Sequence, residues 1–231
     1  MKTTSILLSA VIALVVSGCV STANISIPKA RLAQAAGSTI VVSSREKPDF
    51  ADMKPSNAMF GALGGAVGGA IGGMAAVSSG NALIMKYNVQ DPAATIAKEL
   101  CAYLTARFKV VQYAGKAVAV KTTDINEIAN AAGHGADLVL DVQTVNWSCI
   151  YLPLKWTRYR VIYTVKIRLI DVKKREMIAE GFFAWKTPDG AYNPTFDELF
   201  ANGAEILRQQ LDEASKAATE HFKTEVLNEK G

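Results

Sequence analysis

The stretch GALGGAVGGAIGG, residues 61–73, constrains this 231-residue chain more than any other, because glycine recurs in it at helical spacing. Glycine costs about 1 kcal/mol relative to alanine at each interior position of a helix. A helix here would carry a band without side chains, made of Gly61, Gly65, Gly69 and Gly73 with Gly64, Gly68 and Gly72 beside them. Such a helix needs a source of stability other than its own propensity.

The chain around these glycines is uncharged from Pro55 to Met85. Lipid would favour a helix, because backbone groups in a bilayer must be satisfied internally, and so would close packing of small-residue faces. A single crossing would separate an early strand, 38–44, from the rest of its domain. We therefore expect the glycine-zipper insertion, 56–85, to be a re-entrant or surface-lying hairpin bent near 78–81, or a helix packed against copies of itself. The alternative is a low-complexity loop.

The amino-terminal sequence MKTTSILLSAVIALVVSGC has the pattern of a secretory signal. Lys2 is followed by a short apolar region and then by small residues just before Cys19. This arrangement resembles the bacterial lipoprotein signal, which predicts a signal peptide at 1–18 and a covalent lipid on Cys19. Val20 follows the cysteine, and by resemblance to lipoprotein sorting it favours an outer-membrane anchor with the domain facing the periplasm. We expect no other cofactor.

Composition divides the mature chain into a lipidated tether at 19–37, a periplasmic domain at 38–226 and a tail at 227–231. Hydrophobic periodicity predicts strands and helices in the domain. The predicted strands are 38–44, 109–114, 136–147, 158–171 and 176–185, and the predicted helices are 91–108, 122–133 and 195–226. These elements predict an α+β fold, with a single mixed sheet and helices packed on one face.

Alternation in the strand 158–171 separates a core face from a wet face. The core face holds Tyr159, Val161, Tyr163, Val165, Ile167 and Leu169, and the wet face holds Arg160, Lys166 and Arg168. The last helix has its own apolar stripe, formed by Phe196, Phe200, Leu207, Leu211, Ala214 and Ala218.

Four parts of this pattern resemble the superfamily of the curli secretion lipoprotein CsgG, the TolB amino-terminal domain and the lipoprotein activators of penicillin-binding proteins. They are AATIAKELCAYLTARFKVVQY, INEIANAAGHGADLVLDVQTVNW, VKIRLIDVKKREMIAEG and the final helix. The resemblance spans roughly 38–222 and implies a domain of that fold in an envelope lipoprotein. The glycine segment departs from the family, so the resemblance does not imply a β-barrel pore.

Residue types with catalytic or metal-binding chemistry are sparse. His134 and His221 have no further ligand at metal spacing, which argues against a metal site. Asp137 and Asp141 share a strand face, and we interpret them as turn and edge residues, not as an acid–base pair. No nucleophile elbow, Walker loop or dinucleotide fingerprint is present. We therefore expect a protein that is not an enzyme.

The net charge of +4 comes from scattered lysines and arginines, without a basic face interleaved with aromatics, so we expect no nucleic-acid partner. Cys101 and Cys149 remain once Cys19 is lipidated. The periplasm permits a disulfide between them, and two buried thiols are the alternative.

Together these patterns predict a structural or accessory subunit of a cell-envelope assembly for secretion or transport. Its partners would be the membrane, through the lipid, and copies of itself or another envelope protein, through the glycine segment. The alternative is a monomeric periplasmic regulator that binds and activates an envelope enzyme.

Overall fold

The structure is a computed structural model that describes residues 24–188 and 192–228, with the side chains of 57–71 and of residue 134 outside the description. The helices of the described chain are α1 (Lys29–Ala33), α2 (Pro55–Lys86), α3 (Pro92–Phe108), α4 (Ile125–Ala132), the 3₁₀ turn η1 (Gly133–Gly135), α5 (Phe196–His221) and the π-helical turn η2 (Phe222–Val226). The strands are β1 (Thr39–Arg45), β2 (Ala51–Met53), β3 (Val111–Gln112), β4 (Val118–Val120), β5 (Leu138–Leu152), β6 (Lys155–Asp171) and β7 (Glu176–Lys186).

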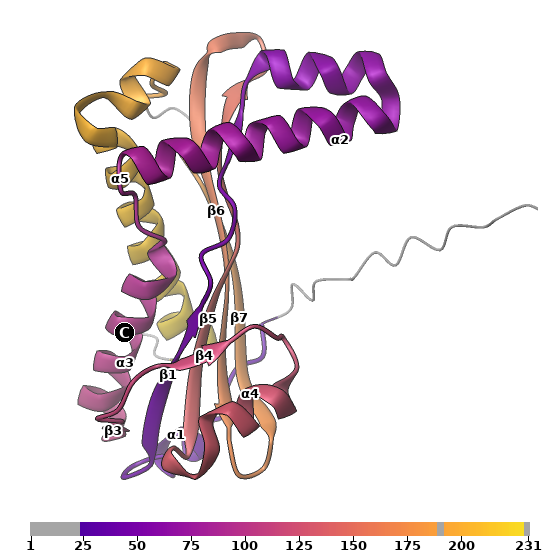
Figure 1. Cartoon of the computed structure of the whole chain (residues 1–231). Coiled ribbons are helices and arrows are strands. Elements are labelled where there is room, and N and C mark those ends of the chain that lie inside the picture. The colour runs from indigo at the N-terminus through magenta and orange to yellow at the C-terminus, as the bar shows by residue number, and fades with distance from the viewer. Residues whose placement is uncertain (1–23, 189–191, 229–231) are drawn as a thin grey trace, which may run out of the picture.

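The described strands form one seven-stranded mixed sheet, which confirms the predicted fold class. The main order is β3-β1-β5-β6-β7, with β2 added to β5 and β4 added to β1. β1 is parallel to β3, β4 and β5, whereas β5, β6 and β7 form an antiparallel meander of long strands (Figure 1). The carboxyl ends of β1 and β5 therefore point toward the same end of the molecule.

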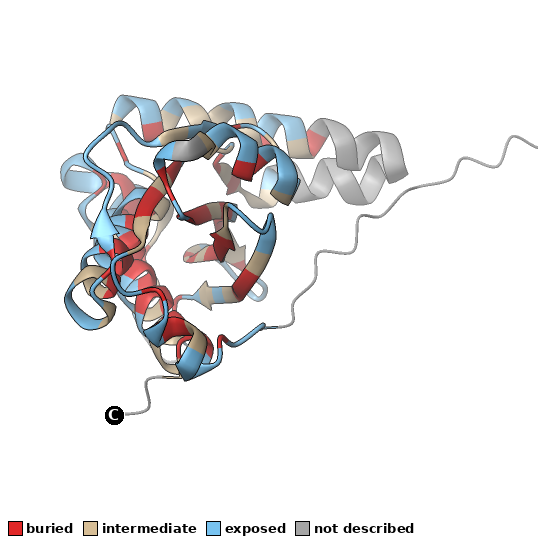
Figure 2. Ribbon diagram, turned by 90° about the horizontal axis from the view of Figure 1, so that it is seen from below, coloured by how far each residue is buried: buried red, intermediate tan, exposed pale blue. Residues whose placement is uncertain are grey.

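The main core lies between the sheet, α3 and α5. Every residue of the predicted core face of β6 is buried, and so are Leu207, Leu211, Ala214 and Ala218 of the predicted stripe on α5. Figure 2, which looks along the strands, shows the buried residues gathered between sheet and helices. Alternation in β6 and the 3.6-residue period in α5 thus correctly predicted which faces meet.

The opposite face of the sheet is covered in part by α4. Val41, Val139 and Ile170 are buried there against Ile128, in a second, smaller core. These strand residues alternate with core residues of the main face, so they point to the other side of the sheet. The prediction that helices pack on one face therefore holds for α3 and α5 but not for α4.

The described part of the predicted tether, residues 24–37, belongs to the fold. Ile25 forms an antiparallel bridge with Glu180 of β7, with N–O distances of 2.7 and 3.0 Å, and Ile27 and Leu32 are buried. Leu227, in the predicted tail, is also buried. The domain thus begins at or before Ile25 instead of residue 38, because isolated apolar side chains in a polar stretch supply contacts that composition alone does not show.

The last predicted helix is interrupted within α5. Ala201–Ala204 have non-helical backbone angles, with positive φ at Asn202, Gly203 and Ala204. Asparagine and glycine tolerate this left-handed conformation better than other residues. The break lets the first turn of α5, capped by a Thr195–Glu198 capping box, pack in a direction different from the rest.

The glycine segment lies within α2, which projects sideways from the sheet and folds back on itself as a helical hairpin (Figure 1). Residues 78–81 are helical, so the bend that we expected there is absent. In the part of the chain that the structure describes, no helix combines the length and hydropathy needed to cross a bilayer.

Candidate functional site

The carboxyl half of α2 is fixed to the sheet at a close backbone contact with β2. A Cβ placed on Gly80 would collide with the backbone carbonyl oxygen of Phe50 and would lie 2.9 Å from the backbone nitrogen of Asp52. Only glycine permits this approach without a backbone shift. In contrast, a Cβ on Gly73 would meet nothing within 4 Å.

Polar side chains secure the same contact. Asn81 accepts a hydrogen bond from the Phe50 backbone at 2.9 Å and donates to Asp49 at 2.7 Å. Ser79 donates to the buried carboxylate of Asp52, which also pairs with Lys54 at 3.0 Å. We call residues 79–81 together with β2 the arm base, since they hold α2 against β5 through β2.

The predicted packing glycines are only partly described. Gly61, Gly64, Gly65, Gly68 and Gly69 lie on α2, and the surroundings of these positions fall outside the described residues. Gly72 is buried and Gly73 is half-buried. Cys19 also lies outside the described residues, so its lipidation stays a prediction. Gly80, which the sequence analysis did not single out, is the glycine that makes a close backbone contact.

A cleft of about 550 Å³ opens at the carboxyl ends of β1 and β4 and the first turn of α3. Its charged lining residues are Arg45, Glu46, Lys47, Asp91 and Lys121. The rest of its lining combines polar residues such as Gln90 and Gln143 with small and apolar ones, including three alanines of α3. Charged groups of both signs around a mixed wall suit a polar segment or small polar ligand better than an apolar one.

The carboxylate of Asp91 accepts hydrogen bonds from two different elements that border this cleft. It caps α3 by accepting from the Ala93 backbone at 3.0 Å, and it accepts from the hydroxyl of Thr144 at 2.5 Å. Burial raises the pKa of Asp91, and the hydrogen bond from Thr144 opposes that rise only in part. Thr144 also contacts the Tyr163 hydroxyl at 3.0 Å, so the cleft is linked to the main core by a chain of polar groups.

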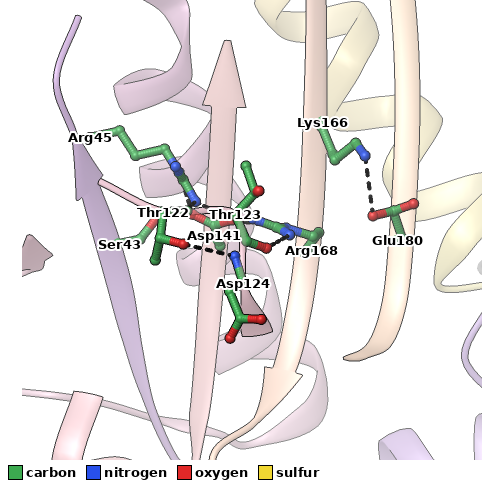
Figure 3. A network of polar contacts seen from close by, with 9 residues as sticks. All are labelled: Ser43, Arg45, Thr122, Thr123, Asp124, Asp141, Lys166, Arg168 and Glu180. Atoms are coloured by element: carbon green, nitrogen blue, oxygen red, sulfur yellow. Dashed lines mark hydrogen bonds and ion pairs between the residues drawn. The ribbon is translucent and has the colours of Figure 1, made fainter. Parts of the chain in front are cut away.

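A buried ion cluster adjoins the cleft on β1, β5 and β6 (Figure 3). Asp141 accepts from Arg45 Nε at 2.7 Å, from Ser43 Oγ at 2.6 Å and from Arg168 Nη2 at 2.6 Å. Asp141 is fully buried, which corrects its interpretation as an edge residue, and Arg168 is buried although we placed it on a wet face. One carboxylate thus joins three strands.

The same two arginines hold the segment before α4. Arg45 Nη2 donates to the backbone carbonyl of Thr122 at 2.8 Å, and Arg168 Nη1 donates to that of Thr123 at 2.9 Å. Burial alone would raise the pKa of Asp141, but the hydrogen bond from Arg45 and the charge of Arg168 outweigh it and lower the pKa. A carboxylate held ionised by two guanidinium groups positions neighbouring elements and is poorly suited to exchange protons.

The remaining reactive side chains are separate from one another. Cys101 on α3 and Cys149 on β5 are free thiols in the main core, so the disulfide alternative is wrong for this structure. Burial raises the pKa of both thiols, which keeps them protonated. His221 packs against Phe183 at 5.0 Å, and His134 lies among residues whose side chains are not described. Among the described residues, no cluster of three or more His, Cys, Asp or Glu could hold a metal ion.

Comparison with known proteins finds only distant structural likeness. No protein-family model and no curated protein sequence matches the chain. The hypothetical protein CT253 from Chlamydia trachomatis aligns with a TM-score of 0.39 and 9% identity, over 82% of this chain and 97% of that one. Lipoprotein GNA1162 from Neisseria meningitidis gives a TM-score of 0.26 and 12% identity, over 78% and 99%.

The LpoB C-terminal domain from Salmonella enterica gives a TM-score of 0.27 and 13% identity, over 68% of this chain and 91% of that one. The structural neighbours thus include a bacterial lipoprotein. At these scores they assign neither a family nor an activity to this chain.

Proposed function

We propose that this protein is a non-enzymatic, outer-membrane lipoprotein that serves as an accessory subunit of a cell-envelope assembly and associates with copies of itself through the glycine segment of α2. The observation that carries the proposal is the arm base. Its contacts fix the carboxyl half of α2 to the sheet, and Figure 1 shows α2 projecting sideways from the sheet and folding back on itself. A helix held in this way can offer small-residue faces to a partner without first paying for its own ordering.

The position of the first described residues supports anchoring close to the membrane. Beyond the Ile25 bridge, Asn24 accepts from the Phe182 backbone at 3.0 Å. The chain from Cys19 to Ile25 can extend over about 20 Å at most. A lipid on Cys19 would therefore hold the domain near the bilayer surface, where neighbouring copies meet at high effective concentration.

The size of the detergent-extracted protein tests self-association. We expect light scattering to show an oligomer for the wild type, a smaller particle for Gly69→Leu, and an intermediate effect for Gly69→Ala, because leucine pushes a packed backbone away more than alanine does. Met85→Ser, at an exposed position near the carboxyl end of α2, is the matched control and should leave the particle size unchanged. An unchanged size for Gly69→Leu would rule out packing through this segment.

The lipid anchor is tested separately by metabolic labelling. The wild-type protein should take up labelled fatty acid, and Cys19→Ala should not. Continued acylation of that variant would contradict the anchor at Cys19 while leaving the size experiment interpretable.

A monomeric regulator that binds an envelope enzyme is the second candidate. The cleft beside α3 favours it, since a cleft of this volume with charges of both signs can receive a polar segment of a partner. A wild-type protein that is monomeric at all concentrations would support this candidate over self-association.

A further inference from the structure

The turn between β5 and β6 exposes large apolar side chains to solvent. Leu154 is 91% exposed and Trp156 is 58% exposed. Monomeric proteins expose single apolar residues often, but a group of them at one protruding turn indicates a contact surface. We call residues 151–156 the hairpin tip.

The hairpin tip is ordered. Tyr151 and Trp156 stack with their ring centroids 5.4 Å apart and their planes 15° apart. Leu154 has a positive φ of 68°, an unfavourable conformation for leucine, and it directs the chain through the tight turn. Because the stacked rings are already fixed, binding through them costs little conformational entropy.

Positive charge surrounds the hairpin tip. The sequence YLPLKWTRYR, residues 151–160, contains Lys155, Arg158 and Arg160 and no acidic residue. Lys155 is exposed to solvent. Arg158 forms an ion pair with Glu198, with 3.3 Å between Nη1 and Oε2. Trp and Tyr prefer the interface between lipid and water, and lysine or arginine nearby is attracted to anionic headgroups.

We propose that the hairpin tip inserts into the interface of a membrane that contains anionic lipid, giving the protein a second membrane contact besides its lipid. A lipid surface fits better than a second copy of the chain. A narrow turn offers far less area than the roughly 800 Å² per partner that a stable protein interface buries, and two such tips would bring like charges together. A bilayer accepts a small wedge of Leu and Trp at any point of its surface.

The short segment from Cys19 to Ile25 limits how the domain would lie on the membrane. Ile25 pairs with Glu180 of β7, and Glu180 pairs with Arg168 of β6. Arg168 is about 40 Å along β6 from Lys155 at the hairpin tip. The segment from Cys19 to Ile25 spans about 20 Å when fully extended. Both contacts reach one bilayer only if the strands lie within about 30° of the membrane plane. This part of the inference rests on the proposed lipid anchor.

Tryptophan quenching by brominated lipid tests the insertion. The full lipidated chain carrying Trp185→Phe is reconstituted into vesicles of phosphatidylcholine, with or without phosphatidylglycerol, that have brominated acyl chains. Trp147 is fully buried, so Trp156 reports the hairpin tip. We expect strong quenching that increases with phosphatidylglycerol and disappears when Trp156→Phe is added.

Two further variants test the residues that carry the proposal. Leu154→Ser should reduce quenching severalfold because it removes apolar area, and Lys155→Glu should abolish the dependence on phosphatidylglycerol. Tyr113→Ser, an exposed aromatic at the opposite end of the sheet, is the control and should leave quenching unchanged.

Two results would overturn the proposal. One is a Trp156 that is open to iodide and unaffected by brominated lipid, and the other is a Trp156 shielded from both, which would show that protein covers the hairpin tip. Mass measurement of the acyl group and light scattering of the same samples separate these outcomes from failure of the anchor or of self-association.

Discussion

Arg168 lies directly opposite Asp141 in the register of β6 and β5, and its guanidinium donates to one carboxylate oxygen from Nε at 3.0 Å and from Nη2 at 2.6 Å. Arg45 approaches the same carboxylate from β1. The pairing therefore ties the parallel part of the sheet to the antiparallel meander, and through Thr122 and Thr123 it also fixes the start of α4.

Replacement of this carboxylate should be costly. We expect Asp141→Asn to lower the free energy of unfolding by about 3 kcal/mol or more, because the buried guanidinium of Arg168 and the partly buried one of Arg45 lose their counter-charge. The exposed pair Lys216–Asp212 provides a control, and Asp212→Asn should change stability by less than about 1 kcal/mol. Chemical denaturation of both variants measures the difference, and equal effects would show that the buried cluster contributes no more than a surface pair.

The lowered pKa of Asp141 predicts how the protein responds to acid. A carboxyl whose pKa is lower in the folded than in the unfolded state stabilises the fold above its unfolded pKa, about 4, and loses this contribution as pH falls through its folded pKa. The wild type should therefore lose more stability between pH 5 and the acid limit than Asp141→Asn does. Denaturation curves of both proteins across that range check it, and parallel pH profiles would contradict it.

The sequence predicted the strong periodic elements well. The core face of β6 and the stripe of α5 follow from residue spacing within one segment. Asp91 and Asp124, at the starts of two predicted helices, are the N-caps of α3 and α4. β2 and β4 escaped prediction because each has three residues and is defined by the neighbour with which it pairs.

The buried charges escaped prediction for a similar reason. Arg168 alternates with apolar residues and resembles a solvated position, and its partner Asp141 lies on another strand. Likewise, nothing near Gly80 in the sequence shows that the backbone of β2 will lie against it. Such residues could be recognised only after the pairing of β5 with β6 and with β2 was known.

Lys166 provides a second test of the face that we expected to be wet. Its ammonium lies 3.6 Å from the buried carboxylate of Glu180, so Lys166→Asp would place two carboxylates together. We expect a loss of about 2 kcal/mol, in contrast to the nearly neutral effect that the alternating pattern implied. Lys173→Asp, in the exposed β6–β7 turn, should change stability by less than about 0.5 kcal/mol. Similar unfolding curves for the two variants would show that Lys166 is solvated after all.

Two glycines of α2 should respond in opposite directions to alanine. Gly73→Ala adds a methyl group where no atom lies within 4 Å, and it should stabilise the helix by about 0.5–1 kcal/mol through reduced backbone entropy of the unfolded chain. Gly80→Ala forces the Phe50 carbonyl away from the helix, and it should destabilise the protein by about 1–3 kcal/mol. Because Asp52 and Asn81 belong to the same contact, Gly80→Ala should also expose residues 45–54 to protease, whereas Gly73→Ala should not.

Thermal unfolding and limited proteolysis of the two variants measure both effects. If Gly80→Ala were as stable and as protected as Gly73→Ala, α2 would not be fixed at the arm base, and the proposal that the sheet presents the glycine segment to a partner would lose its structural support.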